Sequence, residues 1–317
     1  MAPRVLTAGL LLVVGSCGPQ VVDAVDAPAT PGGTAGAGGS IGVGATGGVG
    51  AGGSAGTAGN GGTIADGGTL GDGGAPPIGD GCAGSRSLVH RYTFDGTGTV
   101  VIDAEGGPSG DVVGATLTGD GTVTLAGRMT GEYVDLPNGI LSSLDSATIE
   151  AWLTWAGGYE WQRIFDFGDD QTGVEGSQGT GSTYLFLTPR LTDDGGALVR
   201  LAYQRVGYHE VQLDATRTLP MGTLTHVAVT FDARNETLSV YIDGQLENAL
   251  VGGDVPIRLS MIDDINNWLG RSQYAADPDL GATIEEFRIY ARALDATELA
   301  ASFDAGPNPS CLDAPAP

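Results

Sequence analysis

The chain contains no lysine. Its 14 basic residues are all arginine and are outnumbered by 38 acidic residues, which gives a formal net charge of −24 at pH 7. A protein that binds nucleic acid needs clustered basic side chains, because these displace the counterions that surround phosphates. The arginines here are dispersed along the chain. We therefore predict that nucleic acid is not a partner.

Aromatic residues are scarce, at 6% of the chain, and none occurs before Tyr92. Residues 31–80 instead hold 22 glycines, set among Ala, Thr and Ser. Glycine loses the most backbone entropy on ordering, and small side chains bury too little apolar surface to compensate. We predict a disordered linker over residues 18–81, a single folded domain over 82–312 and a short tail over 313–317.

The N-terminus has no apolar run long enough to cross a bilayer of about 30 Å. Arg4 precedes the apolar stretch Val5–Val14, and small residues follow it, a pattern that predicts a cleaved export signal. Residues Val14–Cys17 resemble the lipobox of bacterial lipoproteins. The resemblance implies a signal over residues 1–17, an acylated Cys17 and an exported protein anchored in a membrane, at the outer membrane or cell surface. The alternative is a plain secretory signal with a chance cysteine.

Cysteine is rare, with three residues in 317. If the lipid anchor uses Cys17, Cys82 and Cys311 remain, at the two ends of the predicted domain. In an exported chain such a pair is expected to form a disulfide bond. The alternative is two free thiols.

Beyond residue 82 the sequence alternates between short apolar or aromatic runs and clusters of Gly, Asp, Asn and Pro. Within residues 148–155, Ile149, Ala151, Leu153 and Trp155 share one face, which is typical of an antiparallel strand in a sandwich. A hairpin is predicted at Asp243-Gly244. The predicted strands are Leu88–Asp95, Asp111–Leu117, Tyr133–Leu136, Thr148–Trp155, Arg163–Phe167, Tyr184–Leu187, Val199–Tyr203, Glu210–Leu213, Thr225–Asp232, Leu238–Ile242, Asn267–Leu269 and Thr283–Tyr290.

One helix is predicted near the C-terminus. Asp295 and Glu298 have the spacing of a capping box, and Leu294, Leu299 and Phe303 are expected to face the core. Many short strands with one terminal helix indicate an all-β fold: an antiparallel two-sheet jelly-roll sandwich.

Several motifs in this order resemble the laminin G-like, concanavalin A-like jelly-roll family over residues 85–303. Such modules bind glycans, bind proteins or act as spacers, so the resemblance constrains the fold more than the function. The motifs are Tyr92–Gly96, Ala147–Trp152, Trp161–Gly168, Tyr184–Pro189, His226–Asp232, Tyr241–Gly244, Asn266–Gln273 and Ile284–Tyr290.

The resemblance also implies a structural calcium ion between the turn after the first strand and the last strand. By position its ligands would be Asp95 and Glu285, with loop carbonyls near Gly110 completing the shell, since calcium prefers oxygen ligands. The alternative is that these acidic residues belong to a solvated surface that keeps the protein soluble.

No enzyme activity is predicted. Glycosidases place two carboxyl groups on one face of the site. Glu285 and Glu286 are adjacent in a predicted strand and should point to opposite faces, and Glu150 has no acidic partner in its own run.

Two loop segments, residues 155–163 and 263–279, combine aromatic rings with arginine and amide side chains, the groups that contact sugar rings and hydroxyls. We predict a non-catalytic surface lipoprotein that binds carbohydrate or a surface glycoprotein. The alternatives are a structural or protein-interaction module and, third, a glycosidase. The competing interpretation of these aromatic and arginine residues, which the sequence favours somewhat, is a role in the core or in a buried network. The predicted ligand-binding residues are Tyr159, Trp161, Arg163, Asn267, Trp268 and Arg271.

Overall fold

A computed structural model describes residues 82, 85–190, 198–252 and 258–312. The predicted export signal, Cys17, the linker and the tail over 313–317 therefore lie outside the described residues. None of the helices within the described ranges has the length and apolar character needed to span a bilayer.

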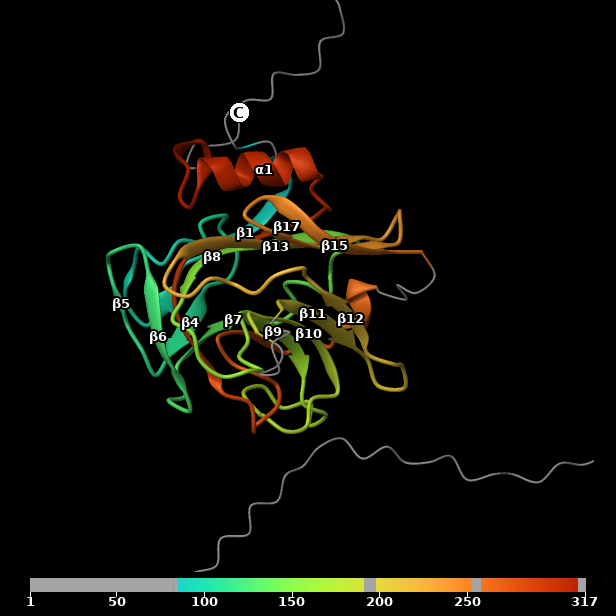
Figure 1. The fold of residues 1–317 in the computed structure, drawn as a ribbon. Coiled ribbons are helices and arrows are strands. Elements are labelled where there is room, and N and C mark those ends of the chain that lie inside the picture. Colours follow the sequence, from blue (N-terminus) through green and yellow to red (C-terminus); the bar gives the residue numbers. More distant parts are fainter. Residues whose placement is uncertain (1–81, 83–84, 191–197, 253–257, 313–317) are drawn as a thin grey trace, which may run out of the picture. The chain divides into compact units, whose positions relative to one another are not determined.

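The described residues form two antiparallel sheets stacked face to face, as predicted (Figure 1). The seven-stranded sheet has the order β1-β17-β8-β13-β14-β15, with β6 also pairing with β17. Its strands are β1 (Leu88–Tyr92), β6 (Val123–Arg128), β8 (Ala147–Trp155), β13 (Leu224–Asp232), β14 (Thr237–Ile242), β15 (Gln245–Val251) and β17 (Asp279–Tyr290).

The eight-stranded sheet has the order β12-β11-β10-β9-β16-β7-β4-β3, and β2 (Thr97–Gly98) pairs with β5 (Leu117–Thr118) separately. Its strands are β3 (Val100–Val101), β4 (Gly110–Val113), β7 (Tyr133–Leu136), β9 (Phe165–Asp169), β10 (Thr183–Thr188), β11 (Arg200–Gln204), β12 (Val211–Asp214) and β16 (Asn266–Leu269). Short 3-10 turns occur at η1 (Ser85–Ser87), η2 (Leu259–Met261) and η3 (Ser310–Leu312).

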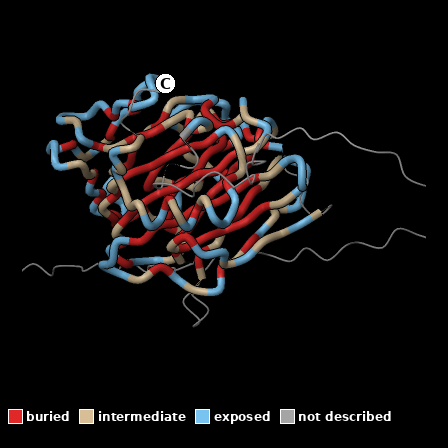
Figure 2. Tube along the Cα trace, turned by 90° about the horizontal axis from the view of Figure 1, so that it is seen from above, coloured by how far each residue is buried: buried red, intermediate tan, exposed pale blue. Residues whose placement is uncertain are grey.

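The hydrophobic core fills the space between the two sheets, and the central strands are buried along most of their length (Figure 2). Phe165 and Phe167 of β9 lie with ring centroids 5.3 Å apart, and Phe287 of β17 meets both from the opposite sheet. The predicted inward face of β8, from Ile149 to Trp155, lies in this core. We call the face of each sheet that is turned away from the core its outer face.

The C-terminal helix α1 (Ala296–Ala305) lies on the outer face of the seven-stranded sheet (Figure 1). The predicted capping box is present: Asp295 accepts hydrogen bonds from the helix N-terminus and Glu298 reaches back. Leu299 is buried, but the prediction that Phe303 faces the core is wrong, because its side chain is 38% exposed and lies over the ring of His226. Because α1 packs against one sheet only, one side of the helix is buried and the other side stays in contact with solvent.

Strand β6 is absent from the prediction. Val123 and Leu125 of β6 are buried in alternation with exposed residues, which is the strand pattern. Gly119, Gly121 and Gly127 all have positive φ, so the sequence around this short strand carries turn signals instead.

The predicted disulfide between Cys82 and Cys311 is present and joins the two ends of the domain, with a Cα–Cα distance of 6.1 Å.

Candidate functional site

A hollow of about 200 Å³ on the outer face of the eight-stranded sheet is lined by four aromatic side chains. The alternation of β10 turns Tyr184 and Phe186 outward, with ring centroids 5.3 Å apart, while Leu185 and Leu187 enter the core. Tyr274 stands edge-on to Tyr184 at 5.7 Å, and Trp161 joins the same cluster. We call the hollow lined by Trp161, Tyr184, Phe186 and Tyr274 the aromatic groove.

Three charged residues complete the lining of the aromatic groove: Arg163, Glu210 and Asp277. Arg163 is buried, and the centre of its guanidinium lies 3.9 Å from the centroid of the Phe186 ring. Glu210 accepts a hydrogen bond from the Tyr184 hydroxyl. Tyr184 and Phe186 are buried, whereas Trp161 and Tyr274 are partly exposed, so the groove offers two aromatic rings beside charged hydrogen-bonding groups, a combination that suits sugar recognition.

Arg163 is held on all three of its nitrogens. Nε donates to Asp166 Oδ2 at 3.2 Å, one terminal nitrogen donates to the Trp161 carbonyl at 2.6 Å, and the other donates to Asp277 Oδ2 at 2.7 Å. Because a planar guanidinium has a fixed fork of donors, these bonds define its orientation. The bond to the Trp161 carbonyl also secures that residue's backbone, whose φ of 65° is unusual for a non-glycine residue.

Two carboxyl groups near the aromatic groove hold their protons more tightly than usual. Burial raises the pKa of the Asp277 carboxyl, and Arg163 opposes this rise without cancelling it. Burial also raises the pKa of Asp166 to about 7, again against the influence of Arg163. Asp166 lies beneath the groove, and its Oδ1 has no hydrogen-bond partner among the described residues.

A second hollow, of about 410 Å³, adjoins the aromatic groove, and Asp277 lines both. In this neighbour the guanidinium centre of Arg271 lies 4.4 Å from the Tyr133 ring and 4.3 Å from the Trp268 ring. Trp268 is fully buried beneath it. Arg271 thus lines the surface, whereas Trp268 supports it from below.

The predicted ligand-binding residues are only partly brought together. Trp161 and Arg163 line the aromatic groove, and Arg271 lines its neighbour. Tyr159 lies instead beside Arg128 in a separate hollow of about 550 Å³, where the Arg128 side chain donates to its hydroxyl at 3.3 Å. Asn267 is buried, and its amide nitrogen donates to the Pro137 and Asp264 carbonyls, a structural role.

Tyr184, Phe186 and Glu210 belong to the groove but are missing from the sequence prediction. Aromatic residues at positions 184 and 186, separated by a core leucine, are a detectable signal of an aromatic outer face. Glu210 carried no such signal, because it reaches the groove only through the pairing of β11 with β12.

The two predicted calcium ligands lie at separate features of the fold. Asp95 is exposed in the turn after β1, and Glu285 lies in β17 where a bulge interrupts the pairing with β8. The described part of the chain holds no group of three or more His, Cys, Asp or Glu side chains placed to bind a metal. Calcium takes six to eight oxygen ligands, and the predicted shell also includes loop carbonyls near Gly110, so the calcium site stays a prediction. A thermal melt with and without chelator tests the prediction.

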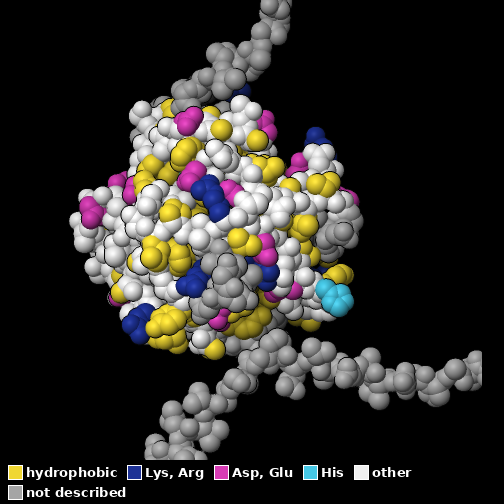
Figure 3. All heavy atoms as spheres, in the orientation of Figure 1, with side chains coloured by type: hydrophobic (Ala, Val, Ile, Leu, Met, Phe, Trp, Pro, Cys, Tyr) yellow, Lys and Arg dark blue, Asp and Glu magenta, His cyan; other side chains and the backbone are white. Residues whose placement is uncertain are grey.

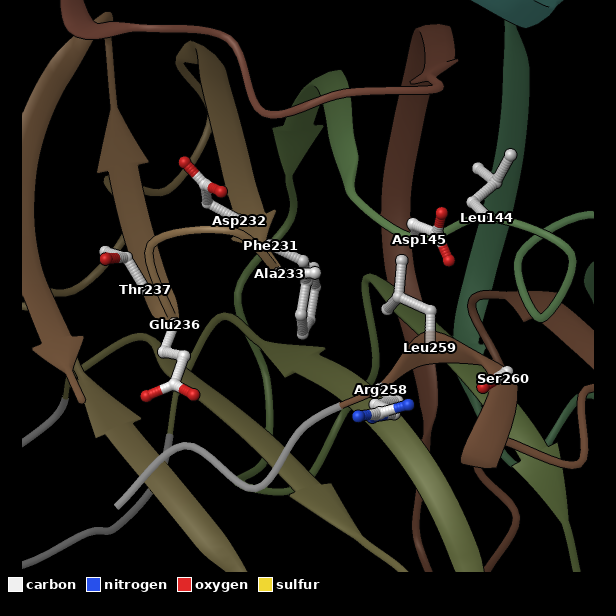
Figure 4. A pocket seen from close by; sticks show the side chains of 10 residues that line it. All are labelled: Leu144, Asp145, Phe231, Asp232, Ala233, Glu236, Thr237, Arg258, Leu259 and Ser260. Atoms are coloured by element: carbon white, nitrogen blue, oxygen red, sulfur yellow. The ribbon is translucent and has the colours of Figure 1, made fainter. Parts of the chain in front are cut away.

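A further hollow, of about 420 Å³, lies at the turn between β13 and β14 (Figure 4). Its carboxylates, from Asp145, Asp232 and Glu236, are spread around the rim rather than gathered at one point (Figure 4). Its single aromatic side chain, Phe231, is buried in the core. This hollow offers no aromatic surface to a sugar.

The outer face of the seven-stranded sheet holds a cluster of buried charges beneath α1, which we call the buried network. Arg288 donates to Glu286 at 2.7 Å and lies 3.6 Å from Glu150. Burial raises the pKa of Glu150, but the hydrogen bond from His226 and the charge of Arg288 outweigh this, so its pKa is lowered. The members are Arg91, Glu150, His226, Glu286 and Arg288.

Solved structures with a similar fold include sugar-binding proteins. Trypanosoma rangeli sialidase in complex with sialic acid aligns with a TM-score of 0.50 at 18% identity, over 69% of this chain and 33% of that one. Domain 4 of AbnA, a GH43 extracellular arabinanase from Geobacillus stearothermophilus in complex with arabinotriose, aligns with a TM-score of 0.49 at 21% identity. The alignment covers 68% of this chain and 97% of that one. The CBM40 of the Ruminococcus gnavus IT-sialidase, bound to α2,3-sialyllactose, aligns with a TM-score of 0.45 at 19% identity. The alignment covers 57% of this chain and 95% of that one. At such identities these likenesses concern the fold alone.

The two-sheet antiparallel sandwich with an open groove on one outer face places the domain among the concanavalin A-like jelly rolls. Residues 127–300 match the family described as the concanavalin A-like lectin/glucanases superfamily (Laminin_G_3). The match spans more than half of the chain, so the chain belongs to this family. No curated protein matches it in sequence.

Proposed function

We propose that this protein is a non-catalytic carbohydrate-binding module and that the aromatic groove is its sugar-binding site. The observation that carries the proposal is an open hollow with the partly exposed rings of Trp161 and Tyr274 at its surface, the buried rings of Tyr184 and Phe186 beneath them, and Glu210 and Asp277 beside them. Aromatic faces pack against sugar C–H groups, while charged and hydroxyl groups fix the sugar hydroxyls. Membership of a lectin/glucanase superfamily supports the same class of ligand.

The absence of catalysis is part of the proposal. Both carboxyl groups that line the groove are engaged with neighbouring side chains: Oδ2 of Asp277 with Arg163 and Ser272, and Glu210 with Tyr184 and Gln212. A glycosidase needs one carboxyl group that protonates the leaving group and a second at a set distance across the bond, and these pairings favour a structural role for both groups instead. Sugar release that is abolished by Asp277→Asn or Glu210→Gln would overturn this part of the proposal.

The proposal also includes a lipid anchor on Cys17, which would hold the binding domain at the outer membrane or cell surface, as the lipobox-like sequence favours. Mass spectrometry of the mature N-terminus tests it. An acylated Cys17 supports the anchor, and an unmodified start elsewhere in the chain refutes it.

The sugar-binding proposal is tested with a glycan array and calorimetry on the mature protein and on Trp161→Ala. Loss of one stacking ring costs about 1–3 kcal/mol where a flat ligand ring stacks on an aromatic side chain, so affinity should fall about 5-fold to 150-fold. Tyr208→Ala is a matched control, because Tyr208 is an exposed aromatic residue that does not line the groove. A protein partner recovered by cross-linking, with no glycan bound, would favour the protein-interaction alternative.

A further inference from the structure

The charge of the aromatic groove bears on which sugars it could accept. Among the described residues that line it, two are acidic, Asp277 and Glu210, and one is a cation, Arg163. The chain as a whole carries a formal charge of −24, and on the face shown in Figure 3 arginines are scattered among acidic and apolar side chains. A ligand therefore approaches a groove whose lining is negative on balance.

The one cation of the groove is already committed. Each nitrogen of Arg163 donates a hydrogen bond within the protein, two of them to the carboxylates of Asp166 and Asp277. Its flat face is covered by the ring of Phe186. These bonds use three of the five guanidinium N–H groups, and because the Arg163 side chain is only 1% exposed, a ligand carboxylate or sulfate does not reach the other two without displacing Asp166 or Asp277.

The adjoining hollow does not supply the missing positive charge. Arg271 lines it, but so do Asp277 and Asp279. An acidic substituent that extended from the groove into this neighbour would meet a surface that also carries more carboxylates than cations.

Asp277, which lines the groove, has one carboxylate oxygen without a partner among the described residues. Oδ2 accepts from both Arg163 and the Ser272 hydroxyl, at 2.7 Å and 2.8 Å, whereas no hydrogen bond within the described residues reaches Oδ1. A sugar hydroxyl or a protonated sugar amine can donate to a carboxylate oxygen, whereas an ionised carboxylate or sulfate group has no proton to donate.

We propose that the groove selects glycans without acidic substituents, namely neutral sugars and amino sugars, because Asp277 and Glu210 line it and Arg163 is buried and ion-paired. This inference rests on the proposed sugar-binding function. It predicts that sialylated, uronic-acid and sulfated ligands bind the aromatic groove more weakly than their unmodified counterparts.

The test uses pairs of oligosaccharides that differ only by an acidic group, such as lactose with sialyllactose and an amino-sugar oligomer with its sulfated form. Affinities are measured by calorimetry at low and at physiological ionic strength, and only binding that Trp161→Ala abolishes is counted. Two like charges about 4 Å apart in water change an equilibrium constant about fivefold, so the unmodified member should bind at least about fivefold tighter at low salt. The preference should shrink as salt screens the charges.

Asp277→Asn keeps the side-chain volume and removes one negative charge. It should therefore reduce the preference for the unmodified sugar over the acidic sugar about fivefold. Glu210→Gln, at the second acidic residue of the groove, should reduce the same preference. Glu236→Gln is the matched control, since Glu236 lies in the separate hollow at the β13–β14 turn and should leave the preference unchanged. Equal or tighter binding of the acidic members by the unaltered protein would overturn the selectivity alone. A panel in which no glycan gives groove-dependent binding would instead overturn the proposed function.

Discussion

The two outer faces of the sandwich are built from similar chemistry and differ in what covers them. On each face a buried arginine lies flat on an aromatic ring: Arg288 is 4.1 Å from the Trp152 centroid, and Arg163 is 3.9 Å from that of Phe186. Each arginine also bonds to carboxylates. Over Arg288, helix α1 and the chain after it close the face, with Ser302 and the Gly306 carbonyl accepting its remaining donors.

The face that carries Arg163 is left partly open. Trp161 and Tyr274 stand beside it without sealing it, and the aromatic groove remains. The comparison shows that arginines, carboxylates and aromatic rings do not by themselves make a binding site. The same set serves to dock a helix on one face and is available to a ligand on the other.

Replacing Arg288 should have the largest effect, because it breaks the covered face. Arg288→Met would leave Glu150 and Glu286 buried without their shared cation, which costs about 3–5 kcal/mol for a buried pair. The midpoint of thermal unfolding should fall by about 10 °C, as measured by circular dichroism. Arg292→Met is the control: its salt bridge to Glu298 is partly exposed, and the loss should stay within about 1 kcal/mol. Equal losses would mean that burial of the network does not matter.

Removal of the disulfide should have the second-largest effect on stability. The bond fixes Cys311, in the segment that follows α1, to the N-terminal end of the domain. The Cys82–Cys311 bond spans 229 residues of sequence. Its removal in the double variant Cys82→Ser, Cys311→Ser should cost about 2–5 kcal/mol, chiefly through the larger entropy of the unfolded chain. Urea denaturation measures the loss. An unchanged midpoint, or free thiols at both positions in non-reducing mass spectrometry, would refute this prediction.

Stability should also depend on pH, with an effect of intermediate size, because of Asp166 beneath the aromatic groove. Asp166 has a pKa raised by burial to about 7, above its ordinary value of 3.8. The folded protein therefore keeps a proton that the unfolded chain releases, so this contribution to stability is complete below about pH 4 and is lost as the pH rises through 7. Asp166→Asn should flatten the decline in unfolding midpoint between pH 4.5 and 8. Parallel pH profiles for the two proteins would contradict this assignment.

Destabilising helix α1, which covers one outer face, should have the smallest effect on the stability of the domain. Asp295→Ala removes the N-cap of α1 and should cost about 1 kcal/mol. Amide hydrogen exchange within the helix should accelerate, while sugar binding in the aromatic groove on the opposite sheet should not change. A matching loss of sugar affinity would show that the two faces are coupled, which would weaken the comparison drawn above.

Much of the fold could be predicted because its signals are local. The period-two pattern of residues 148–155, the Asp243-Gly244 turn and the Asp295 capping box each depend on a few neighbouring residues, and each is present in the structure. Strand β6 escaped prediction because glycines at Gly119, Gly121 and Gly127 dominate its local signal.

The site was predicted less completely, because it depends on contacts between distant segments. The loop that holds Tyr159 and Trp161 sends these two side chains into different hollows. Glu150 has no acidic neighbour in sequence, yet Arg288 links it to Glu286 from another strand. Strand pairing brings such groups together, and no local pattern encodes it.

The sequence alone determined that residues beyond 82 form an antiparallel sandwich with one capped helix and that Cys82 and Cys311 join its ends, because alternation, turn residues and capping act over short distances. Only the tertiary structure decided which outer face is covered and which is open. That outcome depends on where α1 docks and on which side chains Arg163 and Arg288 meet across the sheets, since burial is a property of the packed whole rather than of any segment.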